Sequence, residues 1–165
     1  MADTSSFDVV SEVNMQEVDN AINQARKEIG QRYDFKGSKS SIELNQNEKS
    51  LTIISDDDFK LKSVVDILQG KLIKRGVPIK ALDYGKAEAA ANSTVRQRIA
   101  LRVGINKENA KLIVKMIKDT KRRVQAQIMD DQVRVSGRDK DDLQAIIKML
   151  READLNFAMQ FTNYR

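Results

Sequence analysis

The sequence predicts an α+β protein in which the element order strand, helix, strand, strand, helix, strand occurs twice. Three observations lead to this prediction. Apolar residues alternate in some stretches and recur at helical spacing in others, the apolar positions of the two halves coincide, and residues 86–92 have little to bury and separate the two patterned regions. We therefore expect a first domain over residues 1–85, a linker over 86–92 and a second domain over 93–165.

Each element of the first half has its own local evidence. Phe7 and Val9 alternate with residues expected to face outward, which is typical of a strand. Asn14 can cap the helix that follows, which carries one apolar stripe. Three aspartates at 56–58 suit the N–H groups at the start of the next helix. The expected elements are a strand over 7–13, a helix from Asn14 to Gly30, strands over 41–44 and 50–55, a helix from 56–58 to Gly76, and a strand over 79–84.

The second half repeats this order. Its first strand alternates strictly, with apolar residues on one face and arginines on the other. Two residues that favour helix caps then precede two apolar helical stripes. The expected elements are a strand over 94–103, a helix after Asn106, a hairpin over 124–129 and 132–136, a helix after Asp139, and a last strand with Phe157, Met159 and Phe161.

The two halves align over two long stretches. Residues 7–14 align with residues 99–106 at an offset of 92 positions. Residues 51–68 align with residues 133–150 at an offset of 82 positions. The first half is longer between these stretches, where it contains the loop 33–40, and a loop beyond structural need is a place to look for function. The repeated order favours two ferredoxin-like (RNP-like) βαββαβ domains, each an antiparallel four-stranded sheet with two helices on one face. Because the linker is short, the order leaves open an exchange of terminal strands between the domains.

The composition removes most catalytic chemistry. The chain has neither Cys nor His, so thiolate nucleophiles, thiolate metal sites and the commonest general base are missing. We expect no enzymatic activity, no catalytic residue, no metal and no cofactor. Residues 1–90 carry 13 Lys and Arg against 15 Asp and Glu, whereas residues 91–165 carry 16 against 9. The basic second half therefore predicts a surface for an anionic partner.

Arginines form the strongest candidate site. Arg96, Arg98 and Arg102 lie on one face of their strand, and Arg134 points outward from a central strand of the same expected sheet. Guanidinium groups suit phosphate or a stacked base, so this face predicts a surface for a nucleotide or nucleic acid. In an alternative, the two sheets pack face to face and these arginines are neutralised by acidic residues of the first sheet, namely Asp8, Glu12 and Glu43.

The loop 33–40 is the second candidate. Its backbone N–H groups and one hydroxyl can approach a phosphate, although its spacing is not that of a P-loop. Alternatively, Tyr33 and Phe35 simply anchor the loop in the core. The candidate ligands in this loop are Lys36, Gly37, Ser38 and Lys39.

Several stretches together resemble the YajQ family of small bacterial proteins, over nearly the whole chain. They are Ser-Phe-Asp-Val-Val-Ser at 6–11 with residues 16–21, Arg-Tyr-Asp-Phe-Lys-Gly-Ser at 32–38, and the ending over 156–165. The resemblance implies tandem RNP-like domains, binding of nucleotide or nucleic acid and, for some members, binding of cyclic di-GMP linked to transcriptional control.

We therefore expect a non-enzymatic protein that binds a nucleotide (GTP, ATP or cyclic di-GMP) or RNA and acts in gene regulation, with a transcriptional regulator as a further partner. The alternative is an interaction module that binds an acidic or transcriptional partner without a small ligand. No apolar run approaches the roughly 20 residues of a membrane helix, and residues 1–13 lack the pattern of a secretion signal. We expect a cytoplasmic location and no membrane partner.

Overall fold

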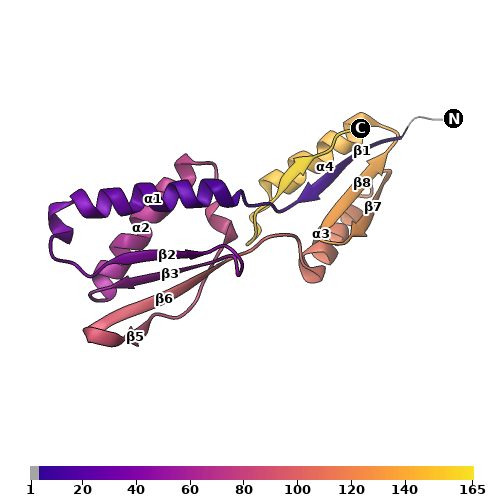
Figure 1. Cartoon of the computed structure of the whole chain (residues 1–165). Coiled ribbons are helices and arrows are strands. Elements are labelled where there is room, and N and C mark those ends of the chain that lie inside the picture. Colours follow the sequence, from indigo (N-terminus) through magenta and orange to yellow (C-terminus); the bar gives the residue numbers. More distant parts are fainter. Residues whose placement is uncertain (1–3) are drawn as a thin grey trace. The chain divides into compact units, whose positions relative to one another are not determined.

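The chain folds into two compact units, one of which interrupts the other in sequence. The computed structural model describes residues 4–165. Residues 13–102 form one unit, which we call the continuous unit. Within the described chain, residues 4–12 and 103–165 form the other, which we call the split unit. The class is α+β with antiparallel sheets (Figure 1), which confirms the fold predicted from the element order.

The continuous unit packs two helices on one face of a sheet (Figure 1). The strand order is β2-β3-β6-β4, and β5 pairs with β6 beside β4. Helix α1 begins after the cap Asn14, whose side chain accepts hydrogen bonds from two backbone N–H groups. Helix α2 is capped by Asp57, whose side chain accepts a hydrogen bond from one backbone N–H group. The elements are α1 (Met15–Gln31), β2 (Ser41–Asn45), β3 (Ser50–Ser55), α2 (Asp58–Lys74), β4 (Leu82–Tyr84), β5 (Glu88–Ala90) and β6 (Thr94–Leu101), with 3-10 turns at Tyr33–Phe35, Ile79–Ala81 and Ala91–Ser93.

The split unit has the same plan, with strand order β7-β8-β1-β9. Its core joins Phe7 and Val9 of the first strand to the apolar stripes of two helices and to Val133 and Val135. Asn106 and Asp139 cap those helices, as the sequence predicts. The elements are β1 (Ser5–Val10), α3 (Lys107–Asp119), β7 (Val124–Met129), β8 (Gln132–Gly137), α4 (Lys140–Glu152) and β9 (Gln160–Thr162).

The predicted domain boundaries are not those of the units. The first strands of the two halves are exchanged: β1 pairs with β8 and β9, whereas β6 pairs with β3 and β4. The two chain crossings between the units therefore fall near residues 12 and 102. The stretch 86–92, expected to be a linker, instead contains β5, which pairs with β6 inside the continuous unit.

Because of this strand exchange, the excess of positive charge is divided differently between the two units than between the two halves of the sequence. Residues 13–102 carry 16 Lys and Arg against 12 Asp and Glu, and the rest of the chain carries 13 against 12. The excess that the sequence places in the second half therefore belongs mainly to the continuous unit, because the arginine strand β6 lies there.

Candidate functional site

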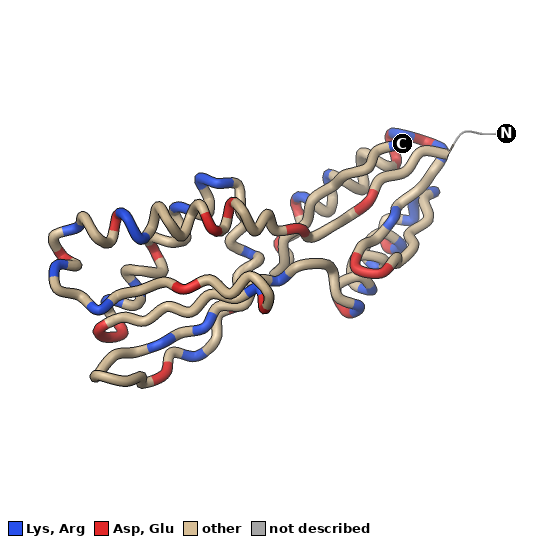
Figure 2. The backbone as a smooth tube through the Cα atoms, viewed as in Figure 1, with Lys and Arg blue, Asp and Glu red and all other residues tan. Residues whose placement is uncertain are grey.

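The sheet of the continuous unit presents two arginines on the face away from its helices. The helix-side residues of β6, such as Ile99, are buried in the core. Arg96 and Arg98 alternate with them and therefore lie on the opposite face, where their side chains are 51% and 60% exposed. Figure 2 shows basic segments spaced along β6 and acidic segments beside it. The alternation of apolar residues and arginines along β6 thus places the guanidinium groups of Arg96 and Arg98 at the surface, as the sequence predicts.

Three of the four predicted arginines lie in the continuous unit, and each of them has a carboxylate partner from that unit. Arg96 Nη2 lies 3.7 Å from Glu88 of β5, Arg98 Nη2 lies 3.0 Å from Glu48 in the β2–β3 turn, and Arg102 Nη2 lies 3.3 Å from Asp83 of β4. All three pairs are exposed, and exposed ion pairs contribute little stability because both charges remain hydrated. A phosphate can therefore compete for these guanidinium groups at small cost. The ion pairs of these three arginines do not include the acids expected to neutralise them, Asp8, Glu12 and Glu43. Of those acids, Asp8 instead pairs with Arg134, within one sheet.

A groove runs beside these arginines. It encloses about 500 Å³ and is lined by Glu48, Thr52, Gly85, Lys86, Glu88, Arg96 and Arg98. Gly85 lets the chain after β4 approach the sheet closely: its N–H donates to the Arg98 carbonyl oxygen at 2.8 Å, and an added Cβ would lie 2.8 Å from that oxygen. The groove has room for more than a phosphate ion and places three basic side chains on one surface, which we call the β6 face.

The loop 33–40 is firmly held to the same unit. Phe35 is buried in the core, with the Arg32 guanidinium and the Lys60 ammonium over its ring. Tyr33, by contrast, is 88% exposed. The aromatic anchor expected from the sequence is therefore Phe35 alone, and the Tyr33 ring is available to a partner.

The expected phosphate donors of this loop are already occupied. The Ser38 hydroxyl and the Lys39 N–H both donate to the Asp56 carboxylate, the latter at 2.9 Å. These hydrogen bonds hold the pKa of Asp56 below its ordinary value, with the Ser38 bond as the largest cause. The loop therefore does not offer Ser38 or the Lys39 amide to a phosphate. Gly37 adopts a φ of 75°, a left-handed conformation that favours glycine, within the turn of this loop.

The lysine side chains of the loop remain at the surface. Lys36 is exposed, and Lys39 donates its ammonium to the Asn92 carbonyl oxygen at 3.2 Å. Asn92 lies two residues before Thr94, the first residue of β6. Lys39 thus connects the loop to the end of the sheet at which β6 begins.

Arg134 does not belong to this surface. It lies in the split unit, where its Nε donates to Asp8 Oδ1 at 2.9 Å, and Asn163 Nδ2 donates to Asp8 Oδ2 at 2.8 Å. These partners lower the pKa of Asp8, with the Arg134 hydrogen bond as the largest cause. The expectation of a four-arginine sheet surface is therefore wrong, because the strand that carries Arg134, β8, and the arginine strand β6 lie in different sheets.

Two residues of this region were missed in the sequence. Lys86 lies in the groove, although it falls in the stretch expected to be a linker. Phe59 is 77% exposed in the first turn of α2, next to Lys60, which donates to the Asp34 carbonyl oxygen. The position of Phe59 outside the apolar stripe of Leu61 and Val64 is the feature that could have identified it.

Neither a metal cluster nor a membrane span is found in the described chain. Within residues 4–165, no three acidic side chains gather closely enough to hold a metal ion. No helix in that range combines the length and apolar character needed to cross a membrane.

Fold and site define a class: a small protein of two interleaved α+β units, with an exposed basic sheet face on one of them. The chain belongs to the family described as nucleotide-binding protein YajQ-like, whose sequence model matches residues 5–165. This confirms the resemblance found in the sequence. Relatives named nucleotide-binding proteins include one from Carboxydothermus hydrogenoformans, 58% identical, and one from Chloroherpeton thalassium, 56% identical. Each is aligned over 165 residues, which is the whole of both chains.

A third relative comes from Bacillus cytotoxicus. It is also named a nucleotide-binding protein and is 59% identical over the whole of both chains.

Proposed function

We propose that this protein binds nucleotides or RNA on the β6 face, without catalysing a reaction. The observation that carries this proposal is the pair Arg96 and Arg98, more than half exposed in a groove that Lys86 also lines. Guanidinium groups match phosphate oxygens in charge and geometry. The relatives' names support a nucleotide as the ligand. Action in gene regulation, through cyclic di-GMP or a transcriptional regulator, is part of the same proposal, as is a cytoplasmic location.

Tyr33 supplies the stacking group that the β6 face lacks. Neither β3 nor β6 contains an aromatic residue, whereas base stacking on exposed aromatic rings is the common means of holding single strands. Because the loop is fixed by Phe35 and Asp56, little ordering is needed when a base stacks on Tyr33. We therefore place phosphates at the arginines and a base at Tyr33.

The double substitution Arg96→Ala/Arg98→Ala tests the phosphate contacts. We expect an affinity loss of at least about tenfold, because each charge-assisted hydrogen bond contributes about 1.5–3 kcal/mol. The dependence of log affinity on log salt concentration should also flatten by about one to two units in slope. Calorimetric titrations with GTP, ATP, cyclic di-GMP and a short single-stranded RNA measure both quantities.

The matched control is Lys74→Ala/Arg75→Ala, which removes two positive charges from the end of α2. Arg75 pairs with Glu17 at 3.7 Å, the same distance as the Arg96–Glu88 pair. The control should bind like the wild type. Equal binding by both double variants, or no binding heat with any of the four ligands, would show that the proposal is wrong. Salt-sensitive capture of an acidic protein partner that nucleotides do not displace would favour the interaction module instead.

Substituting Tyr33→Ala tests the stacking contact. Loss of one base stack costs about 1–3 kcal/mol, so the affinity for single-stranded RNA should fall by about fivefold or more, whereas Tyr33→Phe should retain most of it. The salt dependence should stay unchanged, because no phosphate contact is lost. Fluorescence anisotropy at several salt concentrations separates this result from an electrostatic effect, and an unchanged affinity in Tyr33→Ala would remove the loop from the site.

A further inference from the structure

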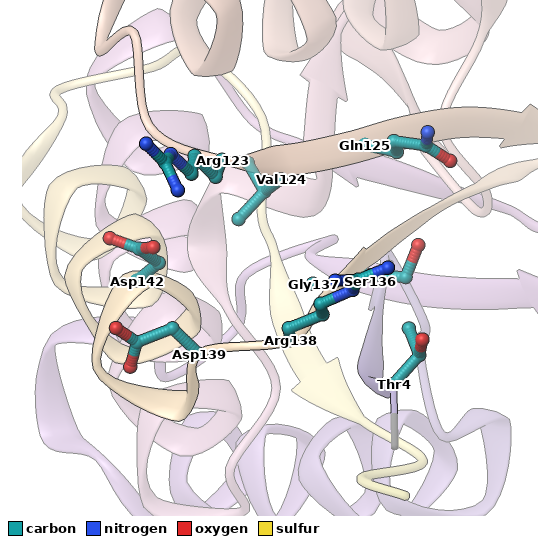
Figure 3. A pocket seen from close by; sticks show the side chains of 9 residues that line it. All are labelled: Thr4, Arg123, Val124, Gln125, Ser136, Gly137, Arg138, Asp139 and Asp142. Carbon is teal, nitrogen blue, oxygen red and sulfur yellow. The ribbon is translucent and has the colours of Figure 1, made fainter. Parts of the chain in front are cut away.

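The split unit contains a polar pocket that lies outside the site described above. It encloses about 670 Å³ at the point where β7 begins and β8 ends, beside the first turn of α4 (Figure 3). Five of its lining residues can donate side-chain hydrogen bonds: Thr4, Arg123, Gln125, Ser136 and Arg138. Ligand pockets commonly enclose about 300–1,000 Å³, so this pocket has room for a nucleotide.

The two arginines of the pocket differ from those of the β6 face. Among residues 4–165, no side chain makes an ion pair or hydrogen bond with the guanidinium group of Arg123 or Arg138, and both side chains are exposed. Both residues line the same pocket, and Figure 3 shows their side chains on neighbouring segments, directed to opposite sides of it. Two positive groups therefore border one cavity without a partner inside the described chain.

The acidic residues of the pocket have partners already. Asp142 Oδ1 accepts a hydrogen bond from Arg122 at 2.9 Å, and Asp139 Oδ1 accepts one from the Asp141 N–H at 2.9 Å as the cap of α4. Arg122 pairs with Asp142. The pocket together with Arg122 therefore has three arginines against two aspartates, Asp139 and Asp142, and carries a net positive charge. The guanidinium groups of Arg123 and Arg138, rather than the helix end, are therefore the groups available to an anion.

We infer that this pocket is a second phosphate site, which binds the phosphate group of a nucleotide. A guanidinium fork binds phosphate oxygens in a bidentate way, and this pocket is lined by two such groups. Gln125 and Ser136 provide neutral groups that can hydrogen-bond to a base or sugar. The inference goes beyond the proposed function, since it gives the chain one site on each unit.

The experiment compares double variants of the full chain, titrated with GMP and with inorganic phosphate. In NMR spectra of the wild type, GMP should shift the Gly137 and Arg138 signals in a saturable way, and phosphate alone should shift them more weakly. Arg123→Ala/Arg138→Ala should reduce the affinity measured from these signals at least tenfold. Arg123→Lys/Arg138→Lys, which keeps the charge but loses the fork, should fall between that variant and the wild type. The control Lys111→Ala/Lys115→Ala on α3 removes the same charge and should leave the affinity unchanged.

The outcomes separate this inference from the proposed function. If Arg96→Ala/Arg98→Ala abolishes binding on the continuous unit while the Gly137 and Arg138 signals still respond, both sites exist. If those signals respond and the β6 face never does, the second site holds and the proposed function fails. The inference is overturned if GMP leaves the Gly137 and Arg138 signals unmoved, or if Arg123→Ala/Arg138→Ala binds as tightly as the lysine control.

Discussion

A fragment of residues 13–102 should fold by itself, whereas a fragment of residues 1–85 should not. Every residue of the core of the continuous unit lies between 13 and 102. The fragment 1–85 lacks β6, which lies between β3 and β4 and supplies Ile99 and Leu101 to that core. Without this strand the sheet loses its centre, and two strand edges lose their hydrogen-bond partners.

Circular dichroism, NMR dispersion and urea unfolding distinguish the two fragments. Residues 13–102 should give dispersed amide signals and one cooperative transition, and residues 1–85 should give neither. A fragment of residues 93–165 is the matched comparison. It lacks β1, the strand between β8 and β9, and should also fail to fold. Dispersed spectra from 1–85 together with an unfolded 13–102 would contradict the strand exchange.

Local patterns in the sequence were sufficient to predict the helices and most strands. The caps Asn14, Asn106 and Asp139 stand where the structure has them. These features depend on residues close in sequence, such as a side chain that accepts the N–H two or three positions later. The pairing of the strands depends on partners far along the chain. Because β1 and β6 show the same alternation of apolar and polar residues, alternation alone does not indicate which sheet each strand joins.

Charge favours the observed pairing over the alternative that alternation left open. Asp8 lies opposite Arg134 in the split unit, and Arg98 lies opposite the neutral Thr52 in the continuous unit. Val9–Val133 and Ile99–Leu51 are the adjacent core pairs. If β6 took the place of β1 with Ile99 at the position of Val9, as the strand pairings rather than the sequence alignment place them, Arg98 would lie opposite Arg134. Like charges directly opposite destabilise a strand pair, so the exchange avoids a repulsion and forms an ion pair instead.

The candidate site was predictable only in part, for a similar reason. Alternation predicts that Arg96 and Arg98 leave the core, but it says nothing about which carboxylates reach them. Two aromatic residues in one loop, Tyr33 and Phe35, look equally suited to anchor it, yet only Phe35 is buried. Asp56 reaches Ser38 and the Lys39 amide only because the loop packs against the end of β3, a tertiary contact that no local pattern encodes.

Substituting Asp8→Asn should destabilise the split unit by about 2 kcal/mol at neutral pH. The Asp8 side chain is 5% exposed and accepts hydrogen bonds from Arg134 and Asn163, which join β1 to β8 and to the C-terminal segment. Hydrogen bonds to a charged group contribute about 1.5–3 kcal/mol, and the substitution removes the charge that strengthens them. The free energy of unfolding of the split unit should fall accordingly.

The effect should depend on pH in one direction. Because folding lowers the pKa of Asp8, with the Arg134 hydrogen bond as the main cause, its stabilising contribution is complete above the pKa of the unfolded chain, about 3.9. This contribution is lost as the pH falls through the lower pKa of the folded state. The difference between wild type and Asp8→Asn should therefore be constant from about pH 5 to 8 and shrink at more acidic pH.

Urea unfolding followed through the NMR methyl signals of Val133 and Val135 measures this difference for the split unit alone, since both residues lie in its core. The control is Glu43→Gln, a strand carboxylate of the continuous unit that has no ion pair among the described residues. It should change stability by less than about 0.5 kcal/mol. A loss in Asp8→Asn that is as large at pH 3 as at pH 7 would mean that Asp8 acts through its shape rather than its charge, and the electrostatic account of the strand exchange would then fail.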